Sequence, residues 1–333
     1  MKKWIIFSCI GFLALSFFFW RDTFIIQFFQ LRQVVLDRVI PQRDTLISAN
    51  GSDTTLVEDR SIIELEPVAR LDTILSESSG LESIEGRWLW SHNDSGNRPQ
   101  LIALDTAGHL IKLKTIANAE NVDWEDLAQD QDGNLYVGDV GDNAKQRDTL
   151  TIYRLEPTDA SDTVWADIIR FTYPYDHHTQ NGQKPHFDVE AMCVVRDSLW
   201  LFSKNRTKPY DGYTSIYRVP KQAGTYEATL IDSLYLGRGT RLKELEWVTS
   251  ADLSPDQQHL VLLTYSGLWI YSCWQNHSLA DSKVTKLAFT TISQKEAVCF
   301  VSPTEIYLTD EVTKQVLGGR LYRYNLQKWL PPC

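Results

Sequence analysis

The chain has 333 residues, of which 43% are hydrophobic, and this is ample for a closed core. Its 43 Asp and Glu residues outnumber its 33 Lys and Arg residues, which gives a formal net charge of −10. Nucleic-acid binding needs clustered basic residues, so this balance argues against a nucleic-acid partner. The five cysteines, Cys9, Cys193, Cys273, Cys299 and Cys333, are widely spaced without a CxxC pair. They predict neither a zinc site nor a disulfide framework.

An apolar run from Trp4 to Trp20 follows two lysines at the start of the chain. At about 1.5 Å per residue such a run spans roughly 26 Å as a helix, close to the ~30 Å hydrocarbon core of a bilayer. It predicts a hydrophobic helix within residues 1–29 that anchors the protein in a membrane through residues 4–20 and exports the rest of the chain. A cleavable signal peptide is the alternative, because Ala14 and Ser16 form a small-x-small pattern.

Residues 30–60 are expected to form a spacer. They contain a short amphipathic piece that Pro41 ends, followed by a polar stretch without a strong apolar period. Residues 61–333 are rich in aromatic residues and strand formers, and no second polar gap divides them. The economical prediction is one domain over residues 61–333.

Five segments of this domain share one pattern, in which an apolar residue precedes, by seven or eight positions, a Leu or Ile that opens a second apolar run. The segments begin at Ser79, Glu125, Glu190, Ala251 and Glu296. Turn formers lie between the apolar runs, so each unit predicts a strand, a hairpin turn and a strand. Third strands follow as "QLIALDTAG", "LTIYRLEP", "TSIYRVPK", "LWIYSCW" and "RLYRYNL", and fourth strands fit "HLIKLKTI" and "DIIRFTY".

Repeated antiparallel four-stranded units predict an all-β fold, a β-propeller with five visible blades. A degenerate sixth blade is the alternative, since longer intervals separate the second, third and fourth repeats. The last unit lacks a fourth strand, whereas "SIIELEPVARLDTI" before the first unit has no blade of its own. We expect this N-terminal strand to complete the last blade and close the ring.

Acidic residues recur at the head of the inner strand. The first column holds Glu125, Glu190 and Glu296, with Ser79 and Ala251 as exceptions, and the next holds Asp126 and Asp252. Equivalent positions of a propeller lie in rings around its axis, so these carboxylates would converge and repel one another unless cations or backbone amides neutralise them.

An all-oxygen set of carboxylates favours a hard ion, with calcium as the first choice and magnesium or manganese as alternatives. We predict Glu125, Asp126, Glu190 and Glu296 as metal ligands. The competing interpretation is a structural lock, in which these acids accept hydrogen bonds from backbone amides of neighbouring blades and hold no ligand.

A further column follows the second strand of each unit. It contains Asn93, Asp139, Ser203, Thr264 and Asp310, and just beyond them Asp94, Lys204 and Glu311. We predict a binding rim of Asn93, Asp94, Asp139, Asp142, Lys204 and Asp310. His92 is a candidate general base, and a turn-stabilising role is the alternative.

The motifs "ESSGLE", "LWSHNDSGN", "WEDLAQDQDGNLYVGDVGDN", "FDVEAM", "LFSKNR" and "KEAVCF" lie within roughly residues 71–325. This series resembles exported bacterial β-propellers related to the phytase-like group, which is named for the esterase-like activity of phytase, and more loosely the SdiA-regulated propellers. The resemblance implies a propeller in the periplasm or on the outer surface that hydrolyses an ester or phosphoester. It also implies calcium held by Glu125, Asp126, Glu190 and Glu296, with Asp94, Asp139 and Asp142 near the channel mouth. The chain departs from the pattern at Ser79 and Ala251, and it lacks the basic cluster that phytate itself would need.

These features predict a protein of the bacterial cell envelope, anchored in the inner membrane with its propeller in the periplasm, or secreted after signal cleavage. The predicted function is to bind a small molecule or a protein partner on the rim, with a calcium ion in the central channel. The alternative is a metal-dependent hydrolase of a small ester or phosphoester, in which a metal-activated water attacks the substrate.

Overall fold

The computed structural model describes residues 59–333 except residues 85, 145, 157–160, 175–187, 208–209, 238–242, 277–278, 280–281 and 314–316. The predicted membrane anchor and nearly all of the predicted spacer lie outside the described residues. Within the described part of the chain, no helix has the length and apolar character needed to cross a bilayer.

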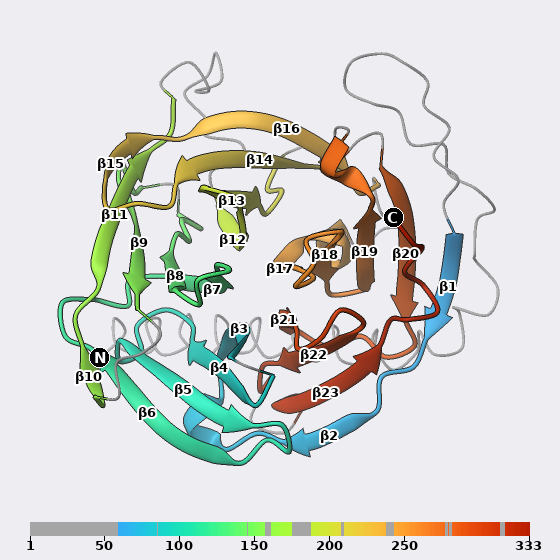
Figure 1. Ribbon diagram of the computed structural model, residues 1–333, viewed down its shortest axis with the longest axis horizontal. Coiled ribbons are helices and arrows are strands. Elements are labelled where there is room, and N and C mark those ends of the chain that lie inside the picture. The colour runs from blue at the N-terminus through green and yellow to red at the C-terminus, as the bar shows by residue number, and fades with distance from the viewer. Residues whose placement is uncertain are drawn as a thin grey trace, which may run out of the picture.

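Five sheets surround a central axis, so the fold is an all-β, five-bladed propeller (Figure 1). Blade 1 contains β3 (Ser78–Ile84), β4 (Trp88–Asn93), β5 (Gln100–Asp105) and β6 (Leu110–Ile116). Blade 2 contains β7 (Trp124–Gln129), β8 (Leu135–Asp139), β9 (Leu150–Leu155) and β11 (Asp167–Thr172). Blade 3 contains β12 (Val189–Val195), β13 (Ser198–Ser203), β14 (Tyr213–Pro220) and β16 (Thr229–Tyr235).

Blade 4 contains β17 (Val248–Leu253), β18 (His259–Thr264), β19 (Gly267–Ser272) and β20 (Lys283–Phe289). Blade 5 contains β21 (Lys295–Phe300), β22 (Glu305–Asp310), β23 (Arg320–Asn325) and β2 (Pro67–Arg70). In the described part of the chain, three short 3-10 helices, Thr73–Leu75, Lys243–Glu246 and Trp274–Asn276, lie in connections. The predicted hairpins, third strands and both fourth strands are confirmed, and the described residues contain five blades rather than six.

The N-terminal segment closes the ring as predicted, because β2 pairs antiparallel with β23 as the outer strand of blade 5. The strand before it, β1 (Asp59–Ile63), runs parallel to β20 and widens blade 4. Two more parallel strands cross between blades: β10 (Thr163–Val164) joins β6, and β15 (Gly224–Glu227) joins β11. β10 comes from the chain segment of blade 2 and pairs with the outer edge of blade 1, and β15 comes from the segment of blade 3 and pairs with the outer edge of blade 2 (Figure 1).

The hydrophobic core fills the spaces between blades. Side chains of a strand alternate between its two faces, and in β12 this alternation serves two interfaces. Ala191, Cys193 and Val195 pack toward blade 4, whereas Met192 and Val194 pack toward blade 2. β12 is therefore apolar on both faces from Ala191 to Val195, which explains why this stretch lacks a polar alternation in the sequence.

Cys273 and Cys333 form a disulfide, with Cα atoms 5.2 Å apart and a sequence separation of 60. The sequence-based expectation of no disulfide was wrong for this pair. Spacing along the chain hid the bond because blades 4 and 5 are neighbours, so the C-terminus returns beside the end of β19 (Figure 1). Cys193 and Cys299 are free and buried.

Two acids, Glu82 and Asp252, are buried in the channel without an ion-pair partner among the described residues. Asp252 accepts hydrogen bonds from the backbone amides of Leu253 (2.7 Å) and Phe300 (2.6 Å). Burial raises the pKa of Asp252 to about 7. Burial, and then the charges of Asp252 and Asp126, raise the pKa of Glu82 well above its usual range.

Replacing Cys333 with Ser removes the cross-link, and we expect the free energy of unfolding to fall by about 2–4 kcal/mol because the bond closes a long loop in the unfolded chain. Equilibrium urea denaturation of the full-length protein measures this change. Reductant should lower the stability of the parent to that of Cys333→Ser and leave the variant unchanged. A parent that is insensitive to reductant would contradict the disulfide.

The buried acids also predict a pH dependence of stability. Their pKa values are higher in the folded protein than in the unfolded chain, so the folded protein holds protons that the unfolded chain releases. The free energy of unfolding should therefore fall as the pH rises from about 4 to about 7. Glu82→Gln removes one of these charges, so its slope should be shallower and its stability at pH 8 higher than that of the parent. Urea curves at pH 5 and pH 8 test this, and parallel slopes for the two proteins would refute it.

Candidate metal centre

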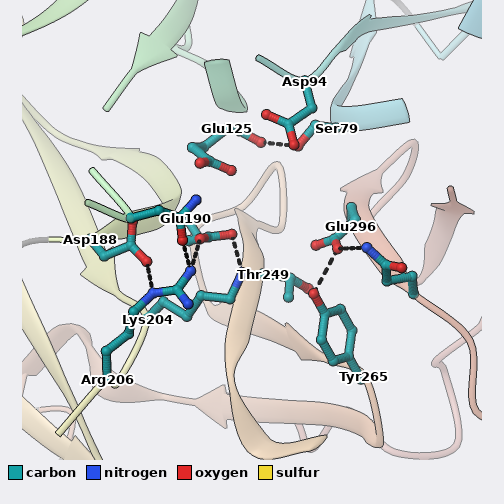
Figure 2. A network of polar contacts seen from close by, with 12 residues as sticks. Ser79, Asp94, Glu125, Asp188, Glu190, Lys204, Arg206, Thr249, Tyr265 and Glu296 are labelled. Carbon is teal, nitrogen blue, oxygen red and sulfur yellow. Dashed lines mark hydrogen bonds and ion pairs between the residues drawn. The ribbon is translucent and has the colours of Figure 1, made fainter. Parts of the chain in front are cut away.

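Inner strands carry β-bulges at the mouth of the central channel. The register shifts by one residue between Trp124 and Asp126, Val189 and Ala191, Val248 and Ser250, and Lys295 and Ala297. A bulge leaves its extra residue unpaired and re-aims the side chain. The extra residues are Glu125, Glu190, Thr249 and Glu296, and Ser79 takes the same place in blade 1, where the extra residue is Gly80. All five lie around one central space (Figure 2).

The structure corrects the alignment of the fourth unit by two residues. Thr249, not Ala251, belongs to the glutamate column, and Asp252 lies two positions beyond the column of Asp126. A shift of two residues keeps every side chain on the same face of a strand, so alternation alone cannot detect it. The pairing of Asp126 with Asp252 in one column was therefore wrong.

Two groups of carboxylates gather at the channel mouth. Asp94, Asp123 and Glu125 form one, and Glu125, Asp188 and Glu190 form the other, each with one oxygen per residue within 4.8 Å of the others. Glu125 is shared by both groups and is only 5% exposed. Its carboxylate makes no hydrogen bond or ion pair with any described residue, although its backbone carbonyl accepts one from Ser79. Each group could hold a metal ion.

Gly141 provides the space that these carboxylates occupy. A Cβ atom there would lie 2.2 Å from Glu125 Oε1 and 2.4 Å from Asp123 Oδ2, so a larger residue would displace them. The amide of Gly141 donates to the Asp123 carbonyl (3.1 Å), and Asp139 Oδ1 accepts from the Asp123 amide (2.9 Å). The "GDVGDN" segment thus forms the wall that positions Asp123 and Glu125.

The opposite wall carries cations that neutralise the second group. Lys204 Nζ lies 2.6 Å from Glu190 Oε2, and the Arg206 guanidinium pairs with Asp188. The Trp247 ring covers both cations, with its centroid 5.4 Å from Lys204 Nζ and 5.0 Å from Arg206 Cζ. Among the described residues, no basic side chain forms an ion pair with Asp94, Asp123 or Glu125 of the first group. Figure 2 shows Lys204 and Arg206 on the side of Asp188 and Glu190.

Glu296 stands apart from both groups. Its Oε1 accepts hydrogen bonds from Tyr265 Oη (2.7 Å) and Gln294 Nε2 (3.4 Å), and Gln294 also donates to Glu311 (2.7 Å). The third glutamate of the column is therefore already hydrogen-bonded, and neither carboxylate group contains it. Its predicted ligand role stays a prediction.

Asp126 lies deeper and joins three blades. Its Oδ2 accepts from the amides of Met192 (2.9 Å) and Ala251 (3.2 Å), and its Oδ1 accepts from the amide of Leu127 (3.0 Å) and from Ser250 Oγ (3.1 Å). This arrangement matches the structural lock that we weighed against metal binding. The ligand role of Asp126 stays a prediction. The four hydrogen bonds that its carboxylate already accepts do not favour that role, because a metal ion would have to replace them.

The predicted rim residues separate into two kinds. Asp94 and Lys204 face the channel mouth (Figure 2). The others bind neighbouring segments: Asn93 contacts Ile74 and Glu77, Asp139 contacts Asp123 and Arg147, Asp142 contacts Gln146 and Arg147, and Asp310 contacts Arg320 and Tyr322.

His92 is fully buried and lies edge-on to Trp124, with ring centroids 5.4 Å apart. Burial lowers its pKa to about 4, so the imidazole is neutral. A Cβ on Gly80 would lie 2.7 Å from His92 Nε2, which shows how closely the inner strands approach here. The general-base role stays a prediction, and this placement fits packing better than catalysis.

Crowding makes the mouth acids hold protons more tightly. Burial, then Asp94 and Asp188, raise the pKa of Asp123 to about 6. Burial raises the pKa of Glu190, and the charge of Lys204 opposes that rise. Burial and then Glu190 raise the pKa of Glu125 well above its usual range. A bound cation would replace these protons.

Sequence reasoning did not assign Asp123, Asp188, Arg206, Trp247 or Tyr265 to the site. A signal for the two aspartates was present, because "DWE" and "DVE" repeat the same spacing ahead of Glu125 and Glu190. Arg206 and Trp247 lie in connections outside the repeated strands, so no column could reveal them.

No family model and no curated protein matches the chain. Similar solved structures include the PQQ-bound aldose sugar dehydrogenase from Streptomyces coelicolor, with a TM-score of 0.42 and 10% identity, covering 78% of this chain and 97% of that one. A calcium-binding protein, regucalcin, from Agrobacterium tumefaciens has a TM-score of 0.41 and 11% identity, with coverage of 81% and 96%. A gluconolactonase from Xanthomonas campestris has a TM-score of 0.41 and 9% identity, with coverage of 86% and 99%. Likenesses this distant carry no argument about function, and the resemblance to the phytase-like group gains no support from them.

Proposed function

We propose that this protein binds a divalent cation, calcium, through Asp94, Asp123 and Glu125 at the mouth of its central channel. The observation that carries the proposal is the Glu125 carboxylate, which is buried yet unpartnered among the described residues. An isolated buried carboxylate is strongly destabilising unless a proton or a cation accompanies it. Three converging carboxylates provide the hard oxygen donors that calcium prefers, and calcium tolerates irregular geometry better than magnesium does.

The first carboxylate group is the better of the two for a metal. Asp188 and Glu190 already have Arg206 and Lys204 as counter-ions, so a metal there would have to displace a cation. Asp94 and Asp123 have no ion-pair partner among the described residues. The predicted ligand role of Glu190 would require Lys204 to move.

We propose that the metal serves to bind a ligand on the propeller mouth. The bound ion would supply positive charge on one side of the mouth, and Lys204 supplies it on the other, 2.6 Å from Glu190. A small ligand with anionic oxygens fits between two such charges.

We also propose that the propeller lies outside the cytoplasm, tethered through residues 4–20 in the inner membrane and facing the periplasm. The disulfide between Cys273 and Cys333 supports this location, because disulfides persist in oxidising compartments. Secretion after signal cleavage gives the same compartment and is the alternative.

A metal-dependent hydrolase of a small ester or phosphoester is the second candidate function. The observation that favours it is Lys204, a buried ammonium that Glu190 and the Trp247 ring hold at the edge of the acidic group. A fixed cation in this position can stabilise negative charge that develops on a substrate oxygen. The metal, when bound, would supply Lewis-acid polarisation.

The metal proposal predicts that full-length protein purified without chelator carries about one calcium ion, and that Glu125→Gln carries none while remaining folded. We expect calcium affinity in isothermal titration to fall by about 100-fold or more, because the central ligand is lost. Gly141→Ala should weaken binding as well, since its Cβ would displace both Glu125 and Asp123.

Glu296→Gln is the matched control, because it neutralises a glutamate of the same column outside the proposed group. It should retain the calcium of the parent. An equal loss in Glu296→Gln would show that the ion sits in the wider ring, and a parent that binds no calcium would overturn the proposal.

The hydrolase alternative predicts calcium-dependent turnover of p-nitrophenyl acetate or p-nitrophenyl phosphate. Lys204→Met should then lower kcat by about 10²–10³ while calcium binding persists, because it removes a charge that acts on the transition state. If the parent turns over neither substrate, the hydrolase alternative fails and binding is the only function still proposed.

A further inference from the structure

Trp165 is the most exposed large hydrophobic side chain in the described part of the chain, at 76%. It lies between β10 and β11, at the outer edge of the junction between blades 1 and 2, far along the sheets from the inner strands that line the channel (Figure 1). An exposed indole on a loose loop would need no explanation. The backbone around Trp165 is not loose.

The residues on either side of Trp165 are fixed to blade 1. β10 runs parallel to β6, and the Ala117 amide donates to the Val164 carbonyl (2.8 Å). On the other side, the amide group of Asn118 both donates to the Ala166 carbonyl (2.9 Å) and accepts from the Ala166 amide (2.8 Å). The fold therefore fixes the backbone that carries this exposed indole, which lowers the entropic cost of using it as a contact surface.

A pocket of about 350 Å³ adjoins the indole. This volume is in the range of small-ligand sites. Its lining consists of Lys114, Arg154, Leu155, Glu156, Val164, Trp165 and Asp167. Two of these residues are basic and two acidic, so their formal charges cancel. Arg154 is held in place by Asp167 (2.8 Å) and by Asn134 Oδ1 (3.2 Å).

We propose that Trp165 and this pocket bind a neutral oligosaccharide. One face of a pyranose ring presents C–H groups that can pack on an indole, and its edges carry hydroxyl groups that both donate and accept hydrogen bonds. The fixed Arg154 and Asp167 pair offers donors and acceptors beside the indole without a net charge. This site is separate from the proposed metal centre and does not rest on it.

The surroundings of the indole favour a sugar over a protein partner. Aromatic anchors of protein interfaces usually lie within a wider apolar patch. Here the apolar neighbours Leu155 and Val164 are buried, and the exposed side chains around the ring include Glu156 and Asp167. A ligand with one apolar face and many hydroxyl groups matches that pattern.

The test is isothermal titration of the full-length protein with cellohexaose, chitohexaose and maltohexaose. We expect at least one of the three to bind, Trp165→Ala to weaken that binding by about tenfold or more, and Trp165→Phe to retain part of it. Trp88→Ala is the matched control, because Trp88 is also an exposed tryptophan, at 41%, on blade 1. It should bind as the parent does. Thermal unfolding should be the same in Trp165→Ala and the parent, since the ring is exposed.

Binding of none of the three sugars would overturn the proposal, and so would equal affinity of Trp165→Ala and the parent. Cross-linking of intact cells provides the other arm. If no sugar binds but Trp165→Ala abolishes a cross-link to another protein, the surface is a protein-docking site and the proposal fails.

Discussion

The centre of this propeller depends on the hydrogen bonds that the carboxylate of Asp126 accepts. It accepts hydrogen bonds from backbone amides of blades 2, 3 and 4, including those of Met192 and Ala251 across the channel. Inner strands of a propeller have no hydrogen-bonded neighbour on the axis side, so such a link fixes their relative positions. The bulge at Glu125, one residue earlier, turns that side chain to the mouth, away from these donors. One strand thus supplies both the lock and the open carboxylate.

The chemistry of the channel mouth comes from differences between the blades at one equivalent position, and not from a symmetric ring of acids. Ser79 and Thr249 replace two of five possible glutamates, and Tyr265 engages Glu296, so the repeated position has different roles in different blades. A connection outside the repeated strands adds Arg206, whose charge pairs with Asp188 in the second carboxylate group. The remaining carboxylates then face each other without a counter-ion among the described residues. This asymmetry is what distinguishes a candidate binding site from a structural ring of acids.

The repeated features of the chain were predicted from the sequence. The contacts between segments that meet only in the folded propeller were not. The hairpins, the ring-closing strand before Leu71 and the glutamate column follow from periodic apolar residues and turn formers. The two-residue misalignment at Ala251 escaped detection because a strand has a period of two. The disulfide of Cys333 and the crossing strand at Thr163 depend on which blades become neighbours, and the contribution of Arg206 depends on a connection. Pattern carries no information on these contacts.

The crossing strands show that the exposure of Trp165 is not forced by the fold. β15 crosses onto blade 2 as β10 crosses onto blade 1, and each covers an edge that would otherwise leave backbone groups unpaired. The residue after β15 is Ala228, which is 1% exposed and whose amide donates to the Thr172 carbonyl (2.8 Å). The same device therefore buries a small residue at one junction and displays an indole at the other. Ring support requires only the first arrangement, and the second leaves the indole free for the ligand that we propose.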